Sequence, residues 1–202
     1  MHKNSLIAVV FMIASAGCAQ VVTPVEIKDP ELRNLQQQYL DELKQTGQEI
    51  LAIQFEYPFY LSRKLDINES QQQRIPQSSI RFDRFNNQVV LAVTGNYFAA
   101  YPADALNKDQ RARNTFLNVT FPILKATVPR FQSNAQVKGY AIEISHHIRG
   151  KVMGVSMERP ENLMVYLPQD AAIRLVAMKD DSARQAALLQ GHVYLNAEPI
   201  TV

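Results

Sequence analysis

The chain has 202 residues, of which 47% are hydrophobic and 20% are charged, proportions typical of a globular protein with one domain. Its 21 basic and 19 acidic residues give a formal net charge of +2, and the basic residues are scattered along the sequence, so we expect no nucleic-acid-binding surface. The single cysteine excludes an intramolecular disulfide.

Residues 1–17 have the layout of a secretory signal peptide. His2 and Lys3 precede an apolar run from Leu6 to Ala14, and small residues follow this run. The run is shorter than the roughly 20 apolar residues that a membrane-spanning helix needs. We therefore expect the chain to be exported and residues 1–17 to be removed.

Two cleavage sites fit this segment, and they give Cys18 different fates. Ala14-Ser15-Ala16 fits the small-x-small rule of ordinary signal peptidase, which would leave a free thiol in a soluble periplasmic or secreted protein. Ser15-Ala16-Gly17-Cys18 resembles the bacterial lipobox, whose cysteine is acylated, although Ser15 stands where lipoboxes usually carry Leu, Val or Ile. This resemblance implies a lipid on Cys18, and Ala19 after it implies the periplasmic side of the outer membrane. Acylation also accounts for an unpaired cysteine in an exported chain.

The mature part is predicted to be a tether over 18–28 and a single domain over 29–202, since residues 18–28 lack apolar periodicity. Asp29-Pro30 is a typical helix start, and apolar residues from Leu32 to Leu43 recur at helical spacing. An amphipathic helix ending at Gly47 is therefore expected. Residues 51–61 then alternate in polarity, which predicts a long strand with one buried face.

The middle of the chain predicts two strands and a helix. Strands over 80–85 and 89–101 are joined by Asn86-Asn87, because asparagine tolerates the positive φ of a tight turn. Asn107 and Gln110 form a variant capping box at the start of a helix. Pro122 is expected to kink this helix, and Pro129 to end it.

The last third predicts a hairpin followed by short elements. A strand over 137–148 turns at Gly150-Lys151 into a strand over 152–157, and a loop over 158–162 leads to a strand over 163–167. Two short helices and a strand over 192–202, bent at Asn196-Ala197, complete the chain. The elements predict an α+β fold. It has a mostly antiparallel sheet of about six to seven strands, an N-terminal amphipathic helix, a kinked middle helix and short C-terminal helices.

The strand over 137–148 also carries the residue types of an active site. Glu143, Ser145 and His147 share one face, with about 7 Å between successive side chains. They match the active site of an enzyme with a nucleophilic residue in residue type only, because same-face neighbours on a strand point in parallel and not at each other. The alternative interpretation is a sheet face exposed to solvent. His146 faces the apolar side. It is expected there either as a half-buried histidine with hydrogen-bond partners or, together with His192, as a candidate metal ligand. No His-x-x-x-His or Cys-x-x-Cys spacing supports the metal.

These features predict a non-catalytic binding or assembly module of the bacterial envelope. Its expected partners are the membrane, through a lipid on Cys18, and an envelope protein or cell-wall component; no cofactor is expected. Two alternatives stay open. One is a small hydrolase or metal-dependent enzyme that uses Glu143, Ser145, His146 or His147, and the other is a carrier of a small apolar ligand behind the strand over 51–61. The residues expected to form a docking patch at the hairpin are His146, His147, Arg149, Lys151 and Arg159.

Overall fold

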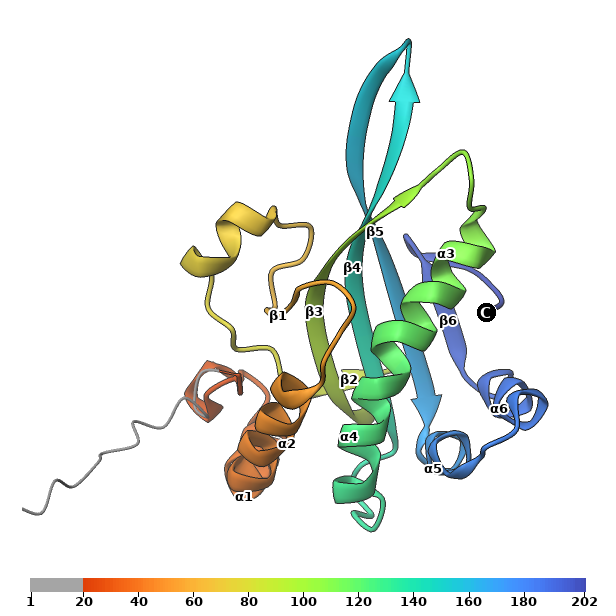
Figure 1. The fold of residues 1–202 in the computed structure, drawn as a ribbon. Helices are drawn as coiled ribbons and strands as arrows, with labels where there is room; N and C mark the ends of the chain where they lie inside the picture. The colour runs from red at the N-terminus through yellow and green to blue at the C-terminus, as the bar shows by residue number, and fades with distance from the viewer. Residues whose placement is uncertain (1–19) are drawn as a thin grey trace, which may run out of the picture.

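The computed structural model describes residues 20–202, which form one mixed sheet with helices packed against it (Figure 1). In these residues the strand order is β1-β3-β4-β5-β6-β7, and β2 also pairs with β3. All neighbouring strands are antiparallel except β3 and β4, which run parallel. The α+β class and the mostly antiparallel sheet are thus as expected. The strands are β1 (Phe59–Leu61), β2 (Arg81–Phe85), β3 (Gln88–Pro102), β4 (Gly139–Val152), β5 (Val155–Pro168), β6 (His192–Leu195) and β7 (Glu198–Pro199).

The kinked middle helix connects β3 to β4, because parallel neighbours need a crossover. It comprises α3 (Lys108–Thr115), a π-helical turn η4 (Phe116–Thr120) and α4 (Phe121–Phe131). The π turn ends two residues before Pro122, whose ring nitrogen cannot donate a helical hydrogen bond. The helix ends at Phe131, two residues after Pro129. The other α-helices are α1 (Pro30–Gln38), α2 (Leu40–Ala52), α5 (Gln169–Ala177) and α6 (Asp181–Leu188); η2 (Pro24–Glu26) and η3 (Glu69–Arg74) are 3₁₀-helices.

The N-terminal helical region is longer than expected, and the predicted strand over 51–61 is wrong. The helix breaks at Tyr39 and resumes as α2, which passes through Gly47 to Ala52, so only the short β1 remains as strand. Gly47 does not end the helix. A Cβ atom there would lie 3.0 Å from the Cβ of Gln20, so glycine permits a close approach of the N-terminal segment.

The start of that segment is packed into the domain, so the prediction of a tether over 18–28 does not fit residues 20–22. Gln20, Val21 and Val22 are buried. The Gln20 carbonyl accepts hydrogen bonds from the amides of Ser79 and Ile80, at 2.8 and 3.0 Å. Residues 20–22 therefore lie along the start of β2 and belong to the core of the domain.

Buried Gln36 joins this segment to β2. Its side-chain amide donates to the Val22 carbonyl at 2.8 Å, and its Oε1 accepts from the Phe82 amide at 2.9 Å. Both contacts satisfy backbone groups on strand edges that would otherwise be left unpaired inside the protein.

The hairpin of β4 and β5 is longer than the sequence indicates. The two strands pair continuously from Gly139↔Pro168 to Val152↔Val155, so the residues expected as a loop over 158–162 belong to β5. The turn lies at Met153-Gly154, not at Gly150-Lys151. Met153 and Gly154 have φ angles of 51° and 82°, the positive values that a two-residue type I′ turn requires.

Substitution of Gln36 by Leu tests the link between α1 and the N-terminal segment. We expect the free energy of unfolding to fall by about 2–4 kcal/mol, because the Phe82 amide and the Val22 carbonyl lose partners in the interior. Chemical denaturation measures the change, and Gln37→Leu on the exposed side of the same helix is the matched control. Equal stability of the two variants would contradict the role of Gln36.

Candidate functional site

The hairpin of β4 and β5 extends beyond the rest of the sheet (Figure 1). Pairing of β3 with β4 stops at Arg149, and the last contact of the β6 side with β5 is the hydrogen bond from the Asn196 amide to the Asn162 carbonyl. We call residues 150–161, which lie beyond these points, the projecting hairpin. Two strands alone are marginally stable in water, so its conformation depends on how its base is held.

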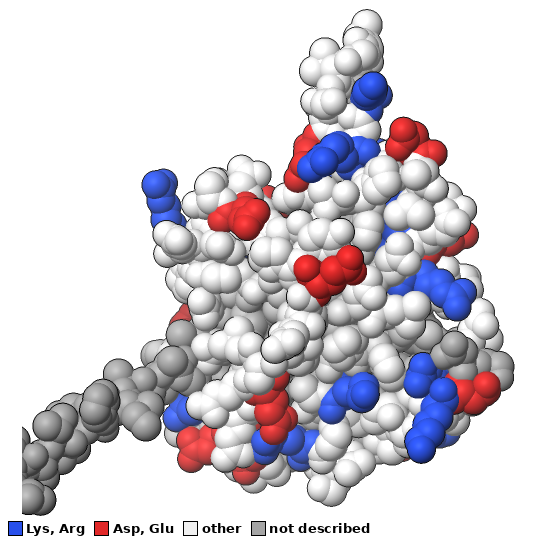
Figure 2. All heavy atoms as spheres, in the orientation of Figure 1, with Lys and Arg blue, Asp and Glu red and all other residues white. Residues whose placement is uncertain are grey.

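Apolar side chains lie at the tip of the projecting hairpin. Met153 in the turn is 99% exposed, Val155 is 65% exposed and Met157 is 52% exposed. Figure 2 shows the tip as a narrow protrusion, mostly white, with Lys and Arg side chains on and below it. Exposed apolar groups clustered in this way mark interaction surfaces in soluble domains.

The hairpin has a polar face and an apolar face. Lys151 pairs with Ser156 on the polar face, whereas Met157 pairs with Gly150 on the other. Glu158 on the polar face accepts from Arg149 at 3.4 Å and contacts Nδ1 of His147 at 2.8 Å. The expected docking patch is therefore divided. His147, Arg149 and Lys151 share the polar face, Arg159 lies on the other face opposite Ile148, and His146 is buried.

A buried ion pair holds the base of the hairpin against α3. The Arg111 guanidinium donates two hydrogen bonds of 2.8 Å to the two carboxylate oxygens of Glu161, and a third, of 2.6 Å, to the Leu106 carbonyl. His146 Nε2 lies 3.1 Å from Glu161 Oε2, and Thr115 Oγ1 lies 3.1 Å from His146 Nδ1. These four side chains, Arg111, Thr115, His146 and Glu161, form the root network.

The protonation states of the root network follow from its contacts. Burial raises the pKa of Glu161, but hydrogen bonds and charges from Arg111 and His146 outweigh burial and bring that pKa to about 2. Burial lowers the pKa of His146 and outweighs its attraction to Glu161. His146 is therefore neutral at pH 7, donating from Nε2 to Glu161 and accepting at Nδ1 from the Thr115 hydroxyl.

Acid is expected to destabilise the protein through this network. The pKa of His146 is lower in the folded chain than its ordinary value of 6.5, so the unfolded chain binds more protons and stability is lost as the pH falls below about 6.5. Glu161 adds a second loss between pH 4.5 and about 2. The groups that face His146 are Glu161 from β5, Arg111 and Thr115 from α3, and the Tyr101 ring from β3.

Denaturation at several pH values checks this expectation. His146→Gln should reduce the loss of unfolding free energy between pH 7 and 5, whereas His192→Gln at an exposed position should leave it unchanged. A wild-type slope in the His146 variant would show that this histidine is not the titrating group.

Glu143, Ser145 and His147 lie on the opposite face of β4 from His146. We call this side of the sheet, which faces away from the middle helix, the open face. Ser145 Oγ donates to Asp66 Oδ1 at 3.0 Å, and His147 contacts Glu158 at 2.8 Å. Within residues 20–202 Glu143 has no hydrogen-bond partner. The three side chains thus have separate environments, and in the described residues no hydrogen bond joins Ser145 to Glu143 or His147, as a nucleophile and its base would require.

The two histidines considered for a metal site lie on different faces of the sheet. His146 is in the root network, while His192 stacks on Tyr166 on the open face, with ring centroids 5.8 Å apart. No group of three or more His, Cys, Asp or Glu side chains in the described part of the chain is placed to hold a metal ion.

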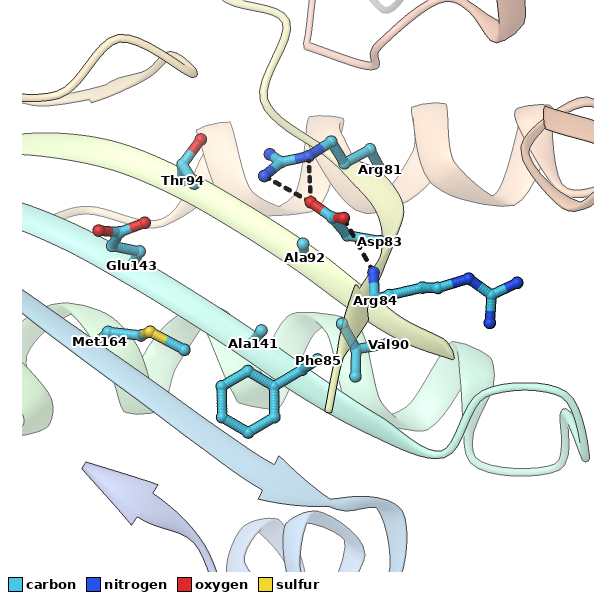
Figure 3. A pocket seen from close by; sticks show the side chains of 10 residues that line it. All are labelled: Arg81, Asp83, Arg84, Phe85, Val90, Ala92, Thr94, Ala141, Glu143 and Met164. Carbon is cyan, nitrogen blue, oxygen red and sulfur yellow. Dashed lines mark hydrogen bonds and ion pairs between the residues drawn. The ribbon is translucent and has the colours of Figure 1, made fainter. Parts of the chain in front are cut away.

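The open face contains a hollow of about 150 Å³ (Figure 3). Ala92 and Ala141, which are neighbours in the β3–β4 register, lie at its floor. Glu143 and Met164 line it farther along β4 and β5, and Phe85 lines its other end. Alternation along residues 137–148 predicts that Glu143 faces this side, but the floor depends on strand pairings that the sequence does not specify.

Comparison of the chain with protein-family models, with curated proteins and with solved structures finds no match. No helix between residues 20 and 202 has the length and apolarity to cross a membrane. Cys18 and residues 1–17 lie outside the described residues. The root network includes three residues, Arg111, Thr115 and Glu161, that the sequence did not single out. The contact between Arg111 and Glu161 spans 50 positions, so it leaves no local signal in the sequence.

Proposed function

We propose that the chain is an exported, non-catalytic module of the bacterial envelope that binds a partner protein through the tip of its projecting hairpin. Lipid on Cys18 anchors it, and Ala19 favours the outer membrane. The observation that carries the proposal is the apolar tip, Met153, Val155 and Met157, on a hairpin whose base is fixed by buried charges.

Met153 is the clearest part of this surface. A side chain at positive φ costs roughly 1–2 kcal/mol, and Asn or Gly is the usual residue in such a turn. Met153 adds the cost of exposing nearly all of a large apolar side chain to water. Folding favours neither feature, whereas contact with a partner accounts for both.

The partner lies in the aqueous compartment and not in the anchoring membrane. Gln20 is buried, and the two residues from Cys18 to Gln20 span at most about 7 Å. An acyl group on Cys18 therefore holds this side of the domain against the bilayer. In Figure 1 the described chain begins at the lower left, far from the hairpin tip at the top, so the tip points away from that bilayer.

The partner has an apolar pocket rimmed by carboxylates. Arg149, Lys151 and Arg159 outnumber Glu158 around the tip, which leaves a local excess of two positive charges. Two copies of this hairpin would repel one another. Pro160 lacks an amide hydrogen, and charged side chains flank it, so addition of a partner strand along β5 is disfavoured. Side chains at the tip therefore make the contact.

Photo-crosslinking in cells tests the docking. A benzophenone amino acid at exposed Ser156 should form an adduct with one protein, which mass spectrometry identifies, and the same group at Gln37 should not. Met153→Ser should weaken binding of that purified protein about tenfold, as expected for a buried interface anchor, without changing the thermal stability of the chain. Adducts with lipid or glycan only, or none at Ser156, would contradict a protein partner.

Intact-mass measurement of the mature protein tests the anchor separately. A chain that begins at acylated Cys18 is expected. Cys18→Ser should release the protein from the membrane fraction, because the variant lacks the cysteine that would carry the acyl chains needed for stable anchoring. A mature chain that begins at unmodified Gly17 would contradict the lipid.

A further inference from the structure

Among the described residues, one carboxylate that lines the hollow on the open face has no hydrogen bond or ion pair. Arg81 is paired with Asp83, with Nη2 and Oδ2 2.8 Å apart. Arg84 also lines the hollow, but its guanidinium points away, as Figure 3 shows, toward Asp29 and Glu31.

Glu143 is that carboxylate, and the nearby Arg81 guanidinium attracts it but forms its ion pair with Asp83. Its neighbour across β3, Thr94, uses its hydroxyl to donate to the Ser62 carbonyl at 2.8 Å, and its neighbour across β5, Met164, offers no hydrogen bond. Burial raises the pKa of Glu143; Arg81 opposes this rise, and Asp66 adds to it. A half-buried carboxylate without a partner favours a cation beside it.

Arg81, Asp83, Arg84 and Thr94 also line the hollow, and its remaining lining residues are apolar. Ala92 and Ala141 leave room above the sheet because their side chains are short, and the larger Phe85 and Met164 also line the space. A cavity of about 150 Å³ accommodates a molecule the size of benzene, about six heavy atoms. An alkyl chain of four or five carbons fits this space.

We propose that this hollow binds an alkylammonium group. The ammonium pairs with the Glu143 carboxylate, and the alkyl chain lies over Ala92 and Ala141. The end of a lysine side chain and a free primary amine share this chemistry. The site is on the open face, so it is independent of docking at the hairpin tip.

Titration of the mature protein, followed by NMR chemical shifts, tests the proposal. The probes are n-butylammonium, N-acetyl-lysine methylamide and n-butanol, which matches the first probe in shape but has no charge. The two cations should shift the amides around Ala92, Ala141 and Glu143, with dissociation constants of about 1 mM, which is typical of weak small ligands. Tighter binding of the lysine derivative assigns the hollow to a lysyl side chain, and tighter binding of butylammonium assigns it to a free amine.

Two variants separate charge from shape. Glu143→Gln should weaken both cations about tenfold, which corresponds to about 1.4 kcal/mol. Ala141→Leu should weaken them by filling the floor while leaving the carboxylate in place, and Glu69→Gln at an exposed position is the control. The affinity of the wild type for both cations should decrease as the pH is lowered, because Glu143 then becomes protonated. Equal binding of n-butanol, unchanged binding in Glu143→Gln, or shifts confined to other surfaces would overturn the proposal.

Discussion

The buried ion pair between Arg111 and Glu161 is the interaction on which the rest of the structure depends. Removing charges from water is expensive, and the pair is tolerated because its hydrogen-bonding groups find partners. Glu161 accepts from Arg111 and His146, and Arg111 also reaches the Leu106 carbonyl. Loss of one partner would cost about 3–5 kcal/mol, since the other charge would stay buried alone. The pair therefore fixes the direction in which the hairpin leaves the sheet more than it adds to net stability.

The alternation of side chains along β4 separates this structural role from the chemistry of the open face. Tyr140 and His146 point toward the middle helix, where they contact Val128 and Thr115. Ala141 and Glu143 point the other way and line the hollow. One strand thus supplies both the support of the hairpin and the lining of the hollow. Since the side chains on the two faces of β4 contact different residues, a substitution on one face does not directly change the contacts of the other.

Local patterns predicted the fold class, the Asn86-Asn87 turn and the alternation of residues 140–148, because each depends on neighbours in sequence. These patterns gave wrong predictions where contacts between residues distant in the sequence determine the structure. Residues 158–162 have a composition typical of loops, yet pairing with β4 extends them as strand. Gly47 looks like a helix end, but it accommodates Gln20. For the candidate site, the sequence placed Glu143 and His146 on opposite faces correctly. It could not identify Arg111, Glu161 or the hollow, which arise from tertiary packing.

The residues at the tip of the hairpin are unfavourable for its turn conformation and for its exposure to water. A type I′ turn forms best with Asn-Gly, and a hairpin that projects into water is most soluble with polar residues at its end. Here the turn carries Met153 before Gly154, and Val155 and Met157 follow. None of these three apolar side chains contributes to the core, and all are exposed in the isolated chain. A residue that is unfavourable for both backbone and solvation is explained when a second molecule covers it, which is why the tip, and not the serine and histidines of β4, carries the functional proposal.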